Sequence, residues 1–74
     1  NNLEKEDLEE QNLNTVILLN PKNEEAIYYL AKLKLKSSDY SKSKELNELL
    51  MNLCNKFCIQ SQKLKKEIEN LSKK

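Results

Sequence analysis

The sequence contains no glycine, no histidine, no tryptophan and no arginine, and its one proline is Pro21. Because glycine and proline are the usual helix breakers, their shortage leaves long stretches free to be helical. The lack of glycine excludes every glycine-rich phosphate-binding loop. The lack of histidine removes the usual base at neutral pH and every cysteine–histidine or serine–histidine pair. We therefore expect an all-α chain that is not an enzyme and holds no cofactor, although a longer parent chain with an enzymatic domain elsewhere stays open.

Charge is nearly balanced, with 13 basic side chains, all lysine, against 12 acids. A net charge of +1 is not typical of nucleic-acid binding, which needs an excess of positive charge on one face. The longest uncharged apolar run, residues 16–19, is far shorter than a membrane span. The first ten residues are acidic, unlike a signal or transit peptide. We expect a cytoplasmic protein that binds neither nucleic acid nor membrane.

Two cysteines, Cys54 and Cys58, stand four residues apart. On one continuous helix they would lie on the same face, but helical geometry disfavours a bridge between them because their Cβ vectors do not converge. Two thiols without histidine do not complete a zinc site. We expect buried, reduced thiols that act as small apolar residues, and no metal. A redox or metal role shared with another chain is the alternative.

Apolar spacing predicts helices over residues 3–19 and 23–36, separated by Asn20-Pro21, because a residue before proline avoids the α conformation. Ser37-Ser38-Asp39 predicts a turn, since short polar side chains compete for backbone hydrogen bonds, and so brief a turn makes its flanking helices antiparallel. From residue 40 the spacing stays helical to the end, with Asn55 as the one plausible break. Two helices split near Asn55 and one helix over 41–72 both stay open, and the uninterrupted pattern favours the continuous helix.

Residues 21–53 carry a spaced set of large, small and aromatic residues. It consists of Ile27, Leu30, Ala31, Tyr40, Ser43 and Leu50, which we predict to be packing residues. Their order resembles a tetratricopeptide (TPR) repeat, and Asn20-Pro21 resembles the proline that closes a preceding repeat. The sequence departs from the family at three positions. Lys34 replaces an aromatic residue, Asn47 a bulky apolar one, and Asn55 the closing proline.

The resemblance implies an antiparallel helical hairpin of TPR type with a flanking N-terminal helix and a long C-terminal helix, as a fragment of a right-handed α-solenoid. Residues 1–21 would be the second helix of a preceding repeat, 22–54 the hairpin, and 55–74 a capping helix. One repeat does not bury its own face, and a chain of 74 residues has a small core. We therefore expect part of a larger helical array, or an oligomer.

The resemblance also implies a scaffold or adaptor that binds a protein or peptide. Many TPR domains of immunophilin-type co-chaperones, which are an alternative for the parent protein, grip an acidic tail with a carboxylate clamp. The clamp positions here hold Glu25 and Tyr29, neither of which attracts a carboxylate. The candidate partner-binding residues are Tyr29, which follows a core position, and Lys32 and Lys36, which stand nearby.

A second function from another class is structural assembly, in which residues 41–72 associate with a partner helix or with a second copy of the chain. Its support is the apolar stripe that ends in Leu64, Ile68 and Leu71. Gln60 and Glu67 interrupt a strict coiled-coil seam. The adjacent acids Glu24 and Glu25 are expected to lie on solvated helix faces, since neighbouring helical residues point in different directions. The three tyrosines are expected to pack with their hydroxyls in water, with Tyr29 as the candidate for a partner groove.

Overall fold

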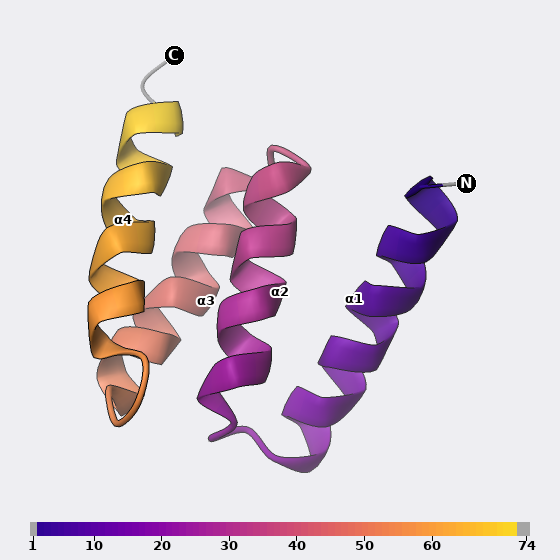
Figure 1. The fold of residues 1–74 in the computed structure, drawn as a ribbon, viewed down its shortest axis with the longest axis horizontal. Helices are drawn as coiled ribbons and strands as arrows, with labels where there is room; N and C mark the ends of the chain where they lie inside the picture. The colour runs from indigo at the N-terminus through magenta and orange to yellow at the C-terminus, as the bar shows by residue number, and fades with distance from the viewer. Residues whose placement is uncertain (1, 73–74) are drawn as a thin grey trace.

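The chain folds into four helices, which a computed structural model describes for residues 2–72, with side chains from residue 8 onward. They are α1 (Asn2–Leu19), α2 (Glu24–Lys36), α3 (Tyr40–Leu53) and α4 (Cys58–Ser72). In Figure 1, α2 lies between α1 and α4, and α3 lies behind α2 and α4. The all-α class predicted from the sequence is confirmed, in a slab that measures 31 × 29 × 15 Å.

The boundaries of α2 follow the polar residues around it. Asn23 caps the amino end, where its side chain accepts a hydrogen bond from the Ala26 backbone N–H at 3.1 Å. Ser38 takes a left-handed conformation with φ of 66° just after the carboxyl end. Asp39 then caps α3 by accepting from the Lys42 backbone N–H at 3.3 Å. The predicted turn at residues 37–39 is confirmed, and Figure 1 shows α2 and α3 antiparallel on its two sides.

The long helix favoured over residues 41–72 is wrong, because α3 ends at Leu53 and α4 begins at Cys58. Cys54 adopts a left-handed conformation with φ of 39° and ψ of 51°, which turns the chain sharply. The turn lets α4 fold back against α3, where Leu64 and Ile68 join the core. A straight helix would carry those two side chains away into solvent, so burial of their apolar surface favours the break. The alternative split near Asn55 is the correct version.

One apolar core runs between α2, α3 and α4. Its buried members are Ile27, Leu30, Ala31, Leu35, Leu46, Leu50, Leu64 and Ile68. Of the six predicted packing residues, five are buried, and Tyr40 is half-buried against this core. Ala31 and Ser43 are fully buried, and the Ser43 hydroxyl donates to the Ala31 carbonyl at 2.7 Å. Two small residues thus permit α2 and α3 to approach closely, as the packing hypothesis requires.

Two of the departures from the repeat pattern have their own partners here. Lys34, which replaces an aromatic residue, forms an ion pair with Glu10 of α1. Asn47, which replaces a bulky apolar residue, is buried in α3, and its amide group donates to the Ser61 carbonyl of α4 at 2.9 Å. Both positions therefore join neighbouring helices by polar contacts where the family pattern uses apolar ones.

The first helix is only partly covered. Leu13 and Ile17 pack against the core, and α1 contacts α2. Leu18 and Leu19 at its end are 82% and 81% exposed. An apolar face of α1 is thus left open next to the Asn20-Pro21 turn.

Replacing Ala31 with tryptophan should disrupt the contact between α2 and α3. The larger ring has no space there, and overpacking of this kind costs about 3 kcal/mol. We expect the thermal midpoint, followed by circular dichroism, to fall by roughly 10 °C or more. Ser41→Trp, at an exposed position of α3, is the control and should melt near the wild-type temperature. An Ala31→Trp chain that melts with the wild type would contradict the close approach of the two helices.

Candidate functional site

A groove of about 900 Å³ lies where α1, α2 and α4 face one another, near the carboxyl end of α2. Its walls come from all four helices and the turn between α2 and α3. The lining residues are Glu9, Asn12, Leu13, Tyr29, Lys32, Leu33, Leu35, Lys36, Ser38, Tyr40, Glu67 and Leu71. Leucines from α1, α2 and α4 line it together with lysines and glutamates. This is the composition of a surface on which another chain can dock.

All three candidate partner-binding residues line this groove. Tyr29 is 52% exposed, so its ring is open to a partner and is not fixed in the core. Lys32 and Lys36 are one helical turn apart on α2 and both reach the groove. The structure therefore brings together the three side chains that the sequence singled out.

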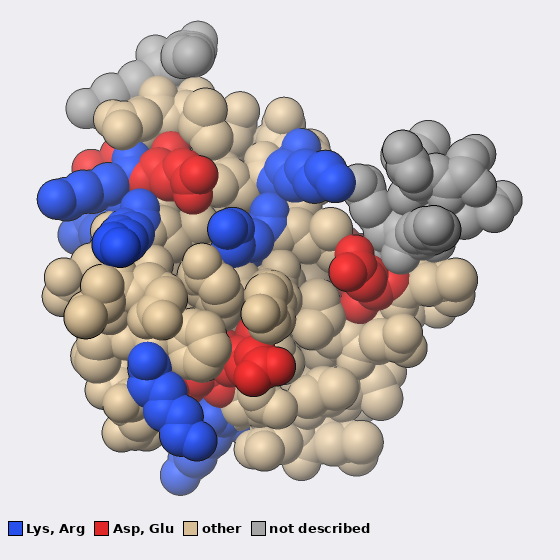
Figure 2. Space-filling model, viewed as in Figure 1, with Lys and Arg blue, Asp and Glu red and all other residues tan. Residues whose placement is uncertain are grey.

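The charges around the groove are mixed. Lys32 and Lys36 of α2 line it together with two acids from other helices, Glu9 of α1 and Glu67 of α4. Figure 2 shows lysines and acids interspersed on the same side of the molecule as Figure 1, between wide areas that carry neither. The groove therefore has no electrostatic field of a single sign, and shape and apolar contact must dominate recognition there.

An aromatic stack connects the groove to the turn between α3 and α4. The Tyr28 ring lies 5.6 Å from the Tyr29 ring and 5.3 Å from the Phe57 ring, between centroids. The Lys32 ammonium group lies 5.5 Å from the centre of the Tyr28 ring, within the range of a cation–π contact. Two groove residues, Tyr29 and Lys32, are thus positioned by a tyrosine that rests on Phe57 of the turn.

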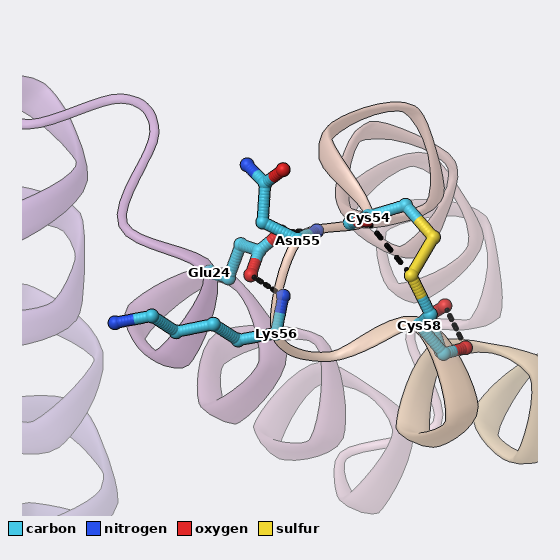
Figure 3. Close-up of a disulfide and its surroundings, with 6 residues drawn as sticks. Glu24, Cys54, Asn55, Lys56 and Cys58 are labelled. Carbon is cyan, nitrogen blue, oxygen red and sulfur yellow. Dashed lines mark hydrogen bonds between the residues drawn. A yellow bond between two sulfur atoms is a disulfide. The ribbon is translucent and has the colours of Figure 1, made fainter.

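Glu24 holds the turn over residues 54–57. The prediction that it lies on a solvated helix face is wrong. Glu24 is 6% exposed, and its carboxylate accepts hydrogen bonds from the backbone N–H groups of Asn55 at 2.5 Å and Lys56 at 2.6 Å. Figure 3 shows the carboxylate directed at these two groups. The neighbouring Glu25 is exposed, as expected. No local pattern identifies Glu24, because its partners lie 31 and 32 residues further along the chain.

The pKa of Glu24 is lowered from its ordinary value of 4.5. The main cause is the hydrogen bond from the Asn55 N–H, and burial of the carboxylate opposes it. The N–H groups of Lys56 and Phe57 and the charge of Lys56 lower the pKa further. Glu24 is also the first residue of α2 and lies beside the start of α4, so the positive ends of two helices favour its charged form.

Cys54 and Cys58 form a disulfide, which corrects the expectation of buried, reduced thiols. Cys54 is exposed and Cys58 is half-buried. The expectation was wrong because it placed both residues on one helix, whereas Cys54 lies in the left-handed turn and Cys58 begins α4. Their Cα atoms are 4.7 Å apart, within the range that a bridge permits. In Figure 3 the bridge closes the turn on the side away from Glu24.

The described part of the chain holds no cluster of three or more histidine, cysteine, aspartate or glutamate side chains in reach of one metal ion. None of its described helices combines the length and the apolar character of a membrane-spanning segment. Comparison with protein-family models, with curated proteins and with solved structures found no match to this sequence. The site is therefore interpreted from its own geometry.

The buried Glu24 should make stability depend on pH. Because its pKa is lower in the folded chain than in the unfolded one, its contribution is complete above about pH 4.5 and is lost as the pH falls through the lower, folded-state pKa. Glu24→Gln should melt below the wild type at pH 7, and the difference should shrink toward pH 3 as the wild-type carboxylate is protonated. Glu25→Gln, which removes the same charge from an exposed neighbour, is the control. A difference between Glu24→Gln and wild type that is constant from pH 7 to pH 3 would contradict this role.

Asn55→Pro should destabilise the fold although it restores the proline of the repeat pattern. Proline has no N–H to donate to Glu24, whereas Asn55→Ala keeps that donor. We expect the proline variant to melt below the alanine variant in calorimetry. In a Glu24→Ala background the difference between the two should shrink, because the acceptor is gone. Equal melting of both variants in the wild-type background would show that the Asn55 N–H is dispensable.

Proposed function

We propose that this chain is a non-catalytic protein-interaction module, in which a TPR-like hairpin of α2 and α3 presents a groove to a peptide or helix of another protein. In this interpretation α1 corresponds to the second helix of a preceding repeat and α4 to a capping helix. The parts then form a fragment of a right-handed α-solenoid. A cytoplasmic setting remains our expectation from the sequence.

The observation that carries the proposal is the groove between α1, α2 and α4, with Tyr29, Lys32 and Lys36 all on its walls. Half-exposed tyrosines beside an apolar floor are typical centres of binding energy, because the ring supplies a large contact area with little loss of side-chain freedom. Lys32 and Lys36 add hydrogen-bond donors on the same wall.

The groove favours a partner segment with aliphatic or aromatic anchors and charges of both signs. Leu13, Leu33 and Leu71 offer apolar contact, while two lysines and the acids Glu9 and Glu67 also line the groove. This arrangement does not support the carboxylate clamp of co-chaperones. The clamp positions hold Glu25, which is exposed, and Tyr29, which carries no positive charge. A co-chaperone parent is therefore the less favoured form of this proposal.

Structural assembly is the second candidate, and the end of α1 favours it. Leu18 and Leu19 expose most of their surface, as expected for a helix that packs against a further helix. The stripe of α4 that the sequence suggested for this purpose is used inside the chain, because Leu64 and Ile68 are buried in its core. Assembly is thus better supported through α1 than through the C-terminal helix.

Tyr29→Ala should weaken binding of peptides selected on the wild-type chain. A displayed library of random peptides is selected against the immobilised 74-residue chain, and the recovered peptides are measured by fluorescence anisotropy. We expect Tyr29→Ala to raise the Kd about tenfold or more, because central tyrosines commonly contribute at least ~1.4 kcal/mol to binding. Leu49→Ala is the matched control, since it shortens a side chain that is 41% exposed on α3 and outside the groove.

Two results would count against the groove. Selected peptides that bind Tyr29→Ala and Leu49→Ala equally well place the interaction on another surface. If the chain recovers no peptides and sediments as an oligomer that Leu18→Glu dissociates, structural assembly is the better description.

A further inference from the structure

We propose that Cys54 and Cys58 form a reversible thiol–disulfide exchange site, whose partner is a dithiol and whose oxidation locks the turn between α3 and α4. The proposal does not depend on the groove having a partner. It rests on where the bridge lies, on how accessible its two sulfurs are, and on what the enclosed residues contact.

The bridge encloses the three residues that anchor this turn. Asn55 and Lys56 donate their N–H groups to Glu24, and the Phe57 ring stacks on Tyr28. Cys54 must hold a left-handed conformation with φ of 39°, which is unfavourable for a residue with a Cβ atom. The sequence around it contains neither glycine nor proline, so Asn55 is the one residue type there that favours a break. The covalent link and the Glu24 carboxylate, together with the burial of Leu64 and Ile68, therefore hold the turn in this conformation.

The position of the bridge allows a reductant to reach it without unfolding the chain. Cys54 is exposed, and Cys58 is half-buried at the first position of α4. A thiolate of the dithiol attacks Cys54 Sγ, the sulfur–sulfur bond breaks, and Cys58 leaves as a thiolate near the positive end of α4. The second thiol of the reductant then attacks its own sulfur in the mixed disulfide and releases Cys54. The chain gains two electrons and two protons, and the dithiol becomes a disulfide.

Reversibility follows from the same placement. A disulfide that closes a ring of five residues constrains little of the unfolded chain, and an exposed bridge is open to exchange. In a reducing compartment, which the sequence predicts, bridges of this kind form transiently and report the redox state. Opening the bridge leaves the turn held by noncovalent contacts, chiefly the Glu24 hydrogen bonds and the packing of Phe57 against Tyr28.

The test uses the full chain in buffers of reduced and oxidised dithiothreitol, a dithiol, at varied ratio, with iodoacetamide trapping followed by mass spectrometry. The oxidised chain should be lighter by two hydrogens and resist alkylation, and the reduced chain should take two alkyl groups. The two forms should interconvert in both directions while the chain stays folded. On reduction, we expect the thermal midpoint to fall by roughly 5 to 15 °C and the amide protons of Asn55 and Lys56 to exchange about tenfold faster or more.

The control is the Cys54→Ser/Cys58→Ser chain, whose midpoint and amide exchange should not respond to dithiothreitol. A Glu24→Gln chain should lose more stability on reduction than the wild type, because both anchors are then gone. The proposal is overturned if both cysteines of the air-oxidised chain alkylate fully or pair between chains. It is overturned equally if the bridge opens only after unfolding, or if opening it changes neither the midpoint nor the exchange of Asn55 and Lys56.

Discussion

The Glu24 carboxylate joins the first turn of α2 to the turn that leads into α4, and the placement of α4 depends on this contact. A carboxylate removed from water is unfavourable unless hydrogen bonds replace its hydration, and two backbone N–H groups do so here. The same N–H groups would otherwise be left without helical partners, since they precede the start of α4. The carboxylate and the two N–H groups thus replace each other's hydration across two distant segments. This contact fixes the direction in which α4 leaves the hairpin.

The groove depends on this arrangement indirectly, through the turn at residues 54–57. Its walls on α2 and α4 take their relative position from the turn at residues 54–57, and Phe57 of that turn supports Tyr28 beside the groove residues Tyr29 and Lys32. A chain of packed rings therefore runs from the disulfide to the surface proposed for binding. Because the bridge encloses the residues that contact Glu24 and Tyr28, a change at any one of these features affects the others through residues 55–57.

Much of the fold is predictable from the sequence because it depends on local or periodic signals. Asn20-Pro21 and Ser37-Ser38-Asp39 separate helices through backbone chemistry that acts within a few residues, and the spacing of Ile27, Leu30 and Leu50 identifies their buried faces. The break at Cys54 is predicted only as the alternative split near Asn55, because neither glycine nor proline interrupts the helical pattern there. Its cause is the burial of Leu64 and Ile68 together with the distant Glu24 contact, and neither leaves a local trace. The exposed disulfide was missed for the same reason, since its geometry exists only once the helix is broken.

For the groove, the identity of its α2 side chains was predictable, but the contributions of α1 and α4 required the tertiary arrangement.

The buried amide of Asn47 restricts the register in which α3 and α4 pack against each other. Its Nδ2 reaches the Ser61 carbonyl, while its Oδ1 has no hydrogen-bond partner among the described residues. If α4 slid along α3 by one helical turn, Asn47 Nδ2 would lose the Ser61 carbonyl and keep only its weaker contact with Met51 Sδ at 3.7 Å, although leucine could still meet leucine elsewhere in the interface. An apolar side chain at this position would fill space equally well but would tolerate several alignments. Asn47 therefore favours one register between α3 and α4, although an all-apolar contact at this position would be more stable.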